Sequence, residues 1–355
     1  MATAAVPALR PLTVGQLLDQ AIRVYRRNLF KFAGIVAVAQ VPATLAGMLL
    51  GWLIFQASAP LELVALPGAA ALASILGGLL GTGIGFVLML TVAAAAITQA
   101  TADYYLGRPT TFRNAFARAG RSWVRLLAML LWAGLLLAGM LLWTFIPCIG
   151  PLTSYGMELF LTLAIVPIAV PVVVLEKRRG GPALRRAWDL ARRRFWRVGG
   201  FTLILYLFNL LLVGGPLVLL SVLLQAVTVR WIQTGAYETA FILQAAVQSL
   251  LGMAFNLLYL PLHLISMTLL YFDLRVRTEG LDLAWQTEVA LRGELPAAEM
   301  LGQAPPPGRG WFLSWKEVGY FAAITVAPQL LFGVLYALLL PVSYTHLTLP
   351  TNREV

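Results

Sequence analysis

Few side chains of this sequence could do chemistry, and most of them stand inside or beside long apolar stretches. Glu158 lies near the outer end of one apolar run, and His263 lies within another. An ionisable group is costly in lipid and marks an ion or proton pathway when it occurs there. Glu158 equally fits an interfacial position near Pro151, so both interpretations stay open. For His263 we expect a hydrogen bond between helices rather than a ligand site.

Three further carboxylates, Asp103, Glu176 and Asp273, stand at the ends of apolar runs. The dipole of a helix opposes a negative charge at its C-terminus, so each acid requires a partner. We expect each acid to pair with an arginine of a neighbouring amphipathic segment. The cations that soon follow these acids are Arg108, Lys177 and Arg275, and the other candidate polar residues of this region are Arg277, Glu279 and Asp282.

Most catalytic arrangements lack members in this chain. Cys148 is the only cysteine, and His263 is the only histidine outside residues 342–355. Histidine-based metal sites and Cys/His dyads therefore cannot be assembled, and neither a phosphate-binding GxxxxGK[ST] nor a GxSxG motif occurs. We predict no catalytic, cofactor-binding or metal-binding residue and no cofactor. A mechanism that uses carboxylates alone, through Asp103, Asp273 or Asp282, stays open.

The composition is that of a membrane protein. Of the 355 residues, 60% are hydrophobic and 12% are charged, against about 45–50% and about 25% in soluble domains. A bilayer core requires about 20 apolar residues per helix. We therefore expect an all-α, polytopic membrane protein with six to seven transmembrane helices. The expected spans are near 30–55, 70–100, 123–145, 152–175, 198–224 and 240–272, with a further candidate at 318–340.

The positive charges indicate the orientation of these spans. Of 26 lysines and arginines, nearly all lie in the N-terminal segment and in alternate loops, near 101–125, 176–197 and 273–317. Positive loops are retained in the cytoplasm, so we expect a cytoplasmic N-terminus in a bacterial inner membrane. The net charge of +11 lies between apolar runs, which favours contact with anionic lipid over nucleic acid.

Three basic segments share an amphipathic pattern typical of interfacial helices. The first opens with Thr13 and Gln16, a capping-box pair. The segments align with one another, which predicts a threefold internal repeat over about 13–105, 110–177 and 183–275. Their candidate lipid-contact residues are Arg23, Arg26, Arg27, Arg113, Arg118, Arg121, Arg185, Arg186, Arg192, Arg193 and Arg197.

Small and kinking residues occur inside the expected spans. Gly77, Gly81 and Gly85 are spaced four apart, which favours close helix packing over a backbone-lined substrate path. Prolines within spans kink helices and free carbonyl groups, and broken helices form the sites of some transporters. The prolines concerned are Pro42, Pro167, Pro171 and Pro261.

The chain is expected to divide into four parts. Residues 1–283 form the membrane domain, and 284–317 form a cytoplasmic segment with a Pro/Gly-rich linker. Residues 318–341 form a further, truncated transmembrane helix. Residues 342–351 read VSYTHLTLPT, which resembles the translation of a sequencing-library adapter. We therefore expect 342–355 to be a non-native tail and the native chain to continue past Leu340.

Three stretches resemble a bacterial protein family. They are LTVGQLLDQAIRVYRRNLFKF, EKRRGGPALRRAWDLARRRFWRV and YFDLRVRTEGLDL, and the resemblance covers about residues 12–283. The family is the glycerophosphoryl diester phosphodiesterase membrane-domain family, in some members of which this region precedes a soluble catalytic domain. No such domain follows in this sequence, so the resemblance implies a membrane module and carries over no catalytic residue.

Three functions follow as hypotheses. The first is a non-enzymatic inner-membrane module that organises anionic lipid, or a partner protein or catalytic domain encoded nearby, through its basic helices. The second is a transporter or lipid-translocating protein, motivated by the repeats, the prolines and Glu158. The third and weakest is a membrane-embedded enzyme acting on a lipid headgroup.

Overall fold

The structure is a computed structural model that describes residues 9–58, 87, 89–107, 116–117, 119–233, 237–292, 298–302 and 313–345. Within these ranges the chain is helical and contains no strand. It divides into two compact units. The first comprises residues 1–132 and 163–307, and the second comprises 133–162 and 308–355.

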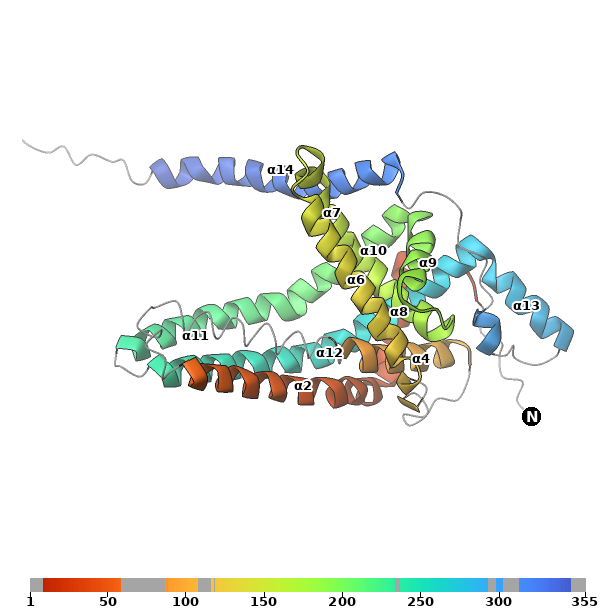
Figure 1. Cartoon of the computed structure of the whole chain (residues 1–355), viewed down its shortest axis with the longest axis horizontal. Helices are drawn as coiled ribbons and strands as arrows, with labels where there is room; N and C mark the ends of the chain where they lie inside the picture. Colours follow the sequence, from red (N-terminus) through yellow and green to blue (C-terminus); the bar gives the residue numbers. More distant parts are fainter. Residues whose placement is uncertain are drawn as a thin grey trace, which may run out of the picture. The chain divides into compact units, whose positions relative to one another are not determined.

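The first unit holds most of the helices (Figure 1). Its elements include one π-helical segment before α4, another after α10, and a short 3-10 helix near its end. In chain order they are α1 (Val14–Arg27), α2 (Leu29–Ser58), η2 (Met89–Ala93), α4 (Ala94–Tyr105), the start of α6 (Trp123–Trp143), α8 (Val166–Leu175), α9 (Gly180–Arg192), α10 (Phe195–Asn209), η4 (Leu210–Gly214), α11 (Gly215–Gln233), α12 (Tyr237–Glu279), α13 (Leu281–Arg292) and η5 (Ala298–Gly302).

Six helical stretches among the described residues are long and apolar enough to cross a membrane. They coincide with six of the seven expected spans, and the seventh, near 70–100, lies largely outside the described residues. Many large apolar side chains on these helices are exposed, which fits lipid as their solvent. The six stretches are Leu29–Leu49, Trp123–Trp143, Ile149–Leu175, Phe195–Ala226, Leu243–Glu279 and Trp315–Val334. The described residues therefore confirm a helical fold with several helices long and apolar enough to cross a membrane.

The long helix α12 organises the first unit. Its 43 residues correspond to about 65 Å at 1.5 Å per residue, roughly twice the thickness of a hydrocarbon core. It packs along α2 and α11, which lie beside it in Figure 1, and also contacts α1, α4 and α8. We expected this span to end before Asp273. The helix instead continues to Glu279, which places Asp273 within its last two turns.

The core of the first unit lies where α4, α8 and the C-terminal part of α12 meet. α4 contributes small residues, with Ala94, Ala95 and Ala96 completely buried, and α8 contributes mostly β-branched residues, among them the completely buried Val172 and Val173. Small and β-branched side chains let the helix backbones approach closely, so these helices pack without large gaps between them.

The N-terminal helix α1 begins with the expected capping box. The Gln16 N–H donates to Thr13 Oγ1 at 3.2 Å, and the Thr13 N–H donates to Gln16 Oε1 at 3.0 Å. Its residues Leu17, Ala21 and Val24 are buried, and the helix packs against α12. Part of its apolar stripe is thus covered by protein.

Helix α9 is more deeply buried than an interfacial helix would be. We expected its apolar stripe to face acyl chains. In the structure Leu184, Ala187, Trp188 and Ala191 are all buried, and α9 packs on α8. The stripe therefore faces protein, and only the flank that carries residues such as Arg185 and Arg193 is exposed.

Each amphipathic segment ends in the same tight turn before an apolar helix begins. In every case a backbone N–H donates to the carbonyl three residues earlier, which breaks the α-helical pattern. The three bonds join Asn28 N to Tyr25 O (3.1 Å), Ser122 N to Ala119 O (2.8 Å) and Arg194 N to Ala191 O (3.0 Å). The carbonyl of the turn residue then starts the next helix, through bonds from Phe32 N, Leu126 N and Val198 N, each 3.0 Å long.

The second unit contains the rest of α6, then α7 (Ile149–Phe160), the start of η3 (Leu161–Ile165), and α14 (Trp315–Thr345). α7 packs against α14, where the Gly156 N–H donates to Thr325 Oγ1 at 2.9 Å. Phe160 and Phe321 meet edge to face at 5.9 Å between ring centroids. α14 continues to Thr345, into the segment expected to be non-native.

The contact between α7 and α14 depends on a glycine. A Cβ at Gly156 would lie 2.3 Å from the Phe321 carbonyl oxygen, whereas one at Gly139 on α6 would have nothing within 4 Å. We predict that Gly156→Ala destabilises the protein by about 1–3 kcal/mol, as overpacking does. Gly139→Ala, which only gains helix propensity, should not. Thermal unfolding in detergent checks this, and a Gly156→Ala variant that melts no lower than wild type contradicts it.

Candidate functional site

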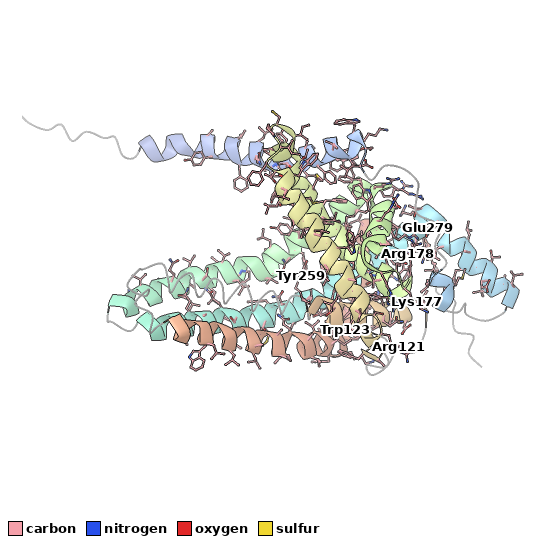
Figure 2. All side chains as sticks on the ribbon, in the orientation of Figure 1. Arg121, Trp123, Lys177, Arg178, Tyr259 and Glu279 are labelled. Atoms are coloured by element: carbon pink, nitrogen blue, oxygen red, sulfur yellow. The ribbon has the colours of Figure 1, made fainter. Side chains whose placement is uncertain are left out.

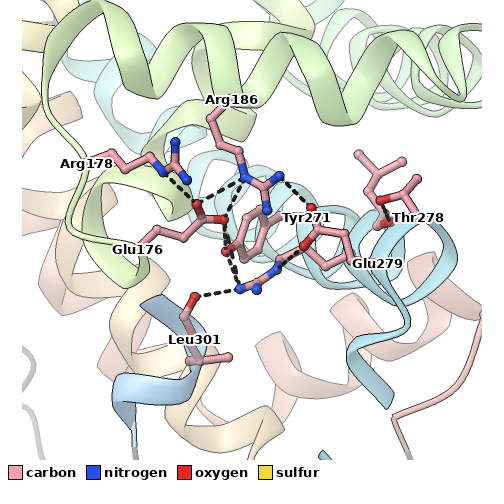
Figure 3. Close-up of polar contacts among 9 residues, drawn as sticks. Glu176, Arg178, Arg186, Tyr271, Thr278, Glu279 and Leu301 are labelled. Carbon is pink, nitrogen blue, oxygen red and sulfur yellow. Dashed lines mark hydrogen bonds and ion pairs between the residues drawn. The ribbon is translucent and has the colours of Figure 1, made fainter. Parts of the chain in front are cut away.

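A cluster of buried charges, here called the Glu176 cluster, lies in the first unit (Figure 3). Two carboxylates, Glu176 and Glu279, and two guanidinium groups, Arg186 and Arg275, have side chains at most 7% exposed. Arg178, which is 22% exposed, pairs with Glu176 at 3.2 Å. Charges removed from water in this way require close partners.

The chain turn after α8 builds this cluster. Glu176 caps the C-terminus of α8, and Lys177 adopts a left-handed backbone with φ of 58°. This turn reverses the chain, so that α9 returns along α8 and brings Arg186 to Glu176. Figure 2 labels Lys177 and Arg178 at this turn. A left-handed residue is a common helix terminator.

Arg186 connects the two carboxylates. Its Nε lies 3.1 Å from Glu176 Oε2 and 3.3 Å from Oε1, and its Nη1 lies 2.5 Å from Glu279 Oε1. Burial alone lowers the pKa of an arginine, but the hydrogen bonds and charges of Glu279 and Glu176 raise the pKa of Arg186 above its ordinary value. Arg186 is therefore a permanent cation that holds α8, α9 and α12 together.

Arg275 makes the second connection. Its Nε donates to Glu279 Oε2 at 3.0 Å, and its Nη1 donates to the Tyr271 hydroxyl at 3.1 Å. The Tyr271 hydroxyl in turn donates to Glu176 Oε1 at 2.9 Å. Arg275 Nη1 also donates to the Leu301 carbonyl at 2.7 Å. The cluster thereby attaches the short helix η5, which carries Leu301, to the helices of the first unit.

A second group of charges, the Asp273 cluster, fixes the N-terminal segment. Asp273 has a completely buried side chain. Its Oδ2 accepts from Arg197 Nη2 at 2.9 Å and from Arg277 Nε at 3.0 Å. Its Oδ1 accepts the Leu12 N–H at 2.8 Å. The Leu12 carbonyl accepts from Arg277 Nη2 at 2.6 Å and from Arg197 Nη2. Both polar groups of Leu12 are therefore bound.

Asp103 is the third buried carboxylate at the end of a core helix. It is 2% exposed and lies near the C-terminus of α4. Gln99 Nε2 donates to its Oδ1 at 3.1 Å. The helices α4, α8 and α12 thus each carry a buried acid in or just after their last turns.

The expected pairing of these acids holds in part. Glu176 pairs with Arg186 of the adjacent amphipathic helix, as expected, and it also pairs with Arg178, not with Lys177. Asp273 pairs with Arg197, but this residue belongs to α10 and not to an amphipathic helix. Ion pairs of this kind stabilise a fold only when the geometry is good and the remaining polar atoms are satisfied.

The candidate lipid-contact arginines fall into three groups. Exposed are Arg23, Arg26, Arg27, Arg121, Arg185 and Arg193. Arg192 and Arg197 are partly buried, and they pair with Asp189 and Asp273. Arg186 is buried between Glu176 and Glu279, which corrects the expectation that it contacts lipid. Arg113, Arg118, Gly77, Gly81 and Gly85 lie outside the described residues.

The remaining candidates lie apart from the clusters. Glu158 is half-buried on α7 in the second unit, and Asp282 is half-buried in the first turn of α13. His263 Nδ1 lies 3.2 Å from the Tyr259 hydroxyl, which donates to the Leu205 carbonyl at 2.8 Å. His263 therefore belongs to a hydrogen-bonded link between α10 and α12. Among the described residues no group of three His, Cys, Asp or Glu side chains could hold a metal ion.

Several participants escaped the sequence analysis: the Arg178 guanidinium, the Tyr271 hydroxyl and the carbonyls of Leu12 and Leu301. Backbone carbonyls have no sequence signature, because every residue carries one. Tyr271 offered a weak signal, since it lies one helical turn before Arg275 and a buried tyrosine hydroxyl usually has a partner.

Comparison with known proteins gives no match. No family model fits the sequence, and neither a curated protein nor a solved structure is significantly similar to it. The chemistry of this protein must therefore be argued from its own geometry. That geometry consists of buried acids held by arginines, with further arginines exposed on the same unit.

Removing Arg186 should leave two buried carboxylates without their shared partner. We predict that Arg186→Met lowers the free energy of unfolding by about 3–5 kcal/mol, the typical effect of breaking a buried pair. Arg179→Met, at an exposed position just before α9, should have little effect. The measurement is thermal or denaturant unfolding in detergent. Equal stability of the two variants would show that the Glu176 cluster contributes nothing.

The Asp273 cluster can be tested at the Leu12 amide. We predict that Asp273→Leu, which removes both acceptor oxygens, raises the hydrogen-exchange rate of this amide by about tenfold or more, since about 1.4 kcal/mol corresponds to a factor of ten. Asp19→Asn, on the exposed side of α1, is the control. Exchange followed by mass spectrometry gives the answer. Unchanged protection in Asp273→Leu would mean that the N-terminal segment is held by other contacts.

Proposed function

We propose that this protein is a non-enzymatic integral membrane module of a bacterial inner membrane. In this proposal its arginine-rich helices face the cytoplasm and organise anionic lipid, or a partner protein encoded nearby. The observation that carries the proposal is the division of its arginines. One set is buried and neutralised by the core acids, and a second set is exposed beside the ends of membrane-length helices.

Four members of the exposed set lie directly beside apolar spans. Arg23, Arg26, Arg121 and Arg193 stand on the outside of helices or turns that lead directly into apolar spans. Each cation near an anionic leaflet gains about 1 kcal/mol. Such residues also set the orientation of a chain during insertion, with the positive side in the cytoplasm.

The acids of the clusters are poor candidates for catalysis. Asp273 is surrounded by two guanidinium groups and a backbone N–H, and Glu176 by three guanidinium groups and a tyrosine hydroxyl. A carboxylate so held is buried and already occupied by donors, and it cannot reach a lipid headgroup. This arrangement supports a structural role for these acids. The enzyme hypothesis would instead require them to be accessible to a substrate.

We further propose that the chain is a threefold repeat of an amphipathic helix followed by a transmembrane hairpin. Three features support this. The turns at Asn28, Ser122 and Arg194 carry the same hydrogen bonds, the hairpins close with buried acids, and π-helical segments precede both α4 and α8. The aligned residues that follow the turns are also buried alike: Phe32, Leu126 and Val198, and then Ile35, Met129 and Phe201.

In such a repeat the Asp273 cluster would have an architectural role. Asp273 ends the third copy, and Leu12 precedes the amphipathic helix of the first copy. Their hydrogen bond, which joins residues 261 positions apart, would close the three copies into a ring. Membership of the glycerophosphoryl diester phosphodiesterase membrane-domain family remains a proposal on the resemblance of residues 12–283.

A transporter or lipid-translocating protein is the second candidate. π-helical segments mark functional sites in many helices, and here η3 and η4 interrupt the membrane-length stretches Ile149–Leu175 and Phe195–Ala226. Glu158 lies close before η3. These features favour transport over the enzyme hypothesis. Buried side chains occupy the interface of α4, α8 and α12, which argues against a substrate path between these three helices.

Reconstitution in vesicles separates the candidates. We expect the wild-type protein in phosphatidylcholine vesicles with phosphatidylglycerol to enrich phosphatidylglycerol around itself, without ion flux, lipid flipping or hydrolysis of a glycerophosphodiester. The reason is that the exposed arginines attract anionic headgroups while the core acids are occupied. Flux or flipping that Glu158→Gln abolishes and Glu158→Asp retains would establish transport instead. Hydrolysis would overturn both candidates.

A further inference from the structure

The three turns that precede apolar helices share an exposed pair of side chains. Each has an exposed arginine just before its hydrogen-bonded turn residue and an exposed apolar side chain three residues after that arginine. The pairs are Arg27 with Phe30, Arg121 with Val124 and Arg193 with Trp196, and the apolar members are 89%, 61% and 57% exposed. We call residues 27–31, 121–125 and 193–197 the junctions.

These apolar side chains point away from a well-packed core. Two residues after each of them, Phe32, Leu126 and Val198 are buried. The helices are therefore anchored on one side and present the junction side chain on the other. A large apolar side chain that is left in water forgoes hydrophobic stabilisation. Three repeated instances on one unit indicate that another medium covers them.

The position of the junctions identifies that medium. The apolar, membrane-length stretches of α2, α6 and α10 begin at Leu29, Trp123 and Phe195, within the junctions themselves. Figure 2 labels Arg121 and Trp123 where α6 starts. An arginine followed by an aromatic or apolar side chain at the start of a span is the arrangement found at the headgroup level of a bilayer. Arginine also binds phosphate oxygens through two parallel hydrogen bonds.

We propose that the three junctions are a three-point anchor for phosphate groups of anionic phospholipids in one leaflet. Arg27, Arg121 and Arg193 bind headgroup phosphates, and the apolar partner of each enters the upper acyl region. This inference rests on the proposed function and names its lipid-binding residues. Because three points define a plane and all three junctions belong to the first unit, the anchor also fixes the depth and tilt of that unit.

The neighbouring cations have other roles. Arg197, the last cation of the third junction, pairs with Asp273. The last cation is therefore not a lipid contact in all three junctions. Arg27 Nη1 donates to the Tyr104 hydroxyl at 3.1 Å, which orients this guanidinium while its other N–H groups remain for a phosphate. Exposed arginines such as Arg10, Arg179 and Arg230 lie outside the junctions and serve as controls.

Spin-label depth measurements test the geometry. In a Cys148→Ser background, single cysteines replace Phe30, Val124 and Trp196, and each is labelled with a nitroxide. The accessibility of the nitroxide to oxygen, compared with its accessibility to a nickel complex, reports its depth in phosphatidylcholine–phosphatidylglycerol vesicles. All three labels should report the same headgroup level. Labels at Leu203 on α10 and at Leu283 on α13, both exposed in the unit, should report hydrocarbon and water respectively. A junction label at the bilayer centre or in bulk water overturns the proposal.

Lipid selectivity tests the chemistry. The triple variant Arg27→Gln, Arg121→Gln, Arg193→Gln should lose about fivefold or more of the preference for spin-labelled phosphatidylglycerol over phosphatidylcholine, given the gain per cation near an anionic surface. The corresponding Arg→Lys triple should retain most of it. The control triple Arg10→Gln, Arg179→Gln, Arg230→Gln should lose much less.

The outcomes distinguish this inference from the function on which it rests. If wild type shows no preference for phosphatidylglycerol, the proposed function itself fails. If wild type shows the preference but the junction triple retains it, or the control triple loses it equally, the three-point anchor fails and the lipid-organising function stands. Far-ultraviolet circular dichroism and the thermal midpoint of each triple show that a lost preference does not come from unfolding.

Discussion

A carboxylate buried near the C-terminal end of a helix is opposed by desolvation and, in the last turn, by the helix dipole, and each of the core helices α4, α8 and α12 carries such a group. Asp103, Glu176 and Asp273 terminate or nearly terminate the three helices that form the core of the first unit. None can remain charged there without donors close by. Much of the non-local structure of the unit follows from the positions of those donors.

The donors come from distant parts of the chain, so satisfying the acids also assembles the unit. Arg186 joins α9 to α8 and α12, and Arg275 adds η5 through the Leu301 carbonyl. Arg197 and Arg277 connect α10 and α12 to the segment before α1. In both clusters guanidinium groups outnumber carboxylates, and a backbone carbonyl accepts some of the remaining donors. The additional arginines, Arg178, Arg197 and Arg277, are partly exposed, so solvent can satisfy the donors that the acids and carbonyls leave over.

Because the buried arginines neutralise the core acids, the exposed arginines must have a different role. Lipid-facing helices gain nothing from one another by hydrophobic burial, so the depth of the unit in a bilayer depends on what stands at the ends of its helices. The junctions supply a cation and an apolar side chain at three such ends. In the proposed function, the same arginine-rich composition serves cohesion inside the unit and contact with the headgroups outside it.

The sequence by itself determined the all-helical class, the apolar spans and the capping box at Thr13, because these depend on composition and on neighbours within one or two helical turns. It also indicated that the terminal acids needed cationic partners, and it identified Arg186 only as one arginine among many. Only the tertiary structure decided that Arg186 is buried, that α9 turns its apolar stripe toward protein, and that Leu12 and Leu301 complete the clusters. These facts depend on contacts between residues up to 265 positions apart and on backbone groups that every residue shares, so no local pattern encodes them.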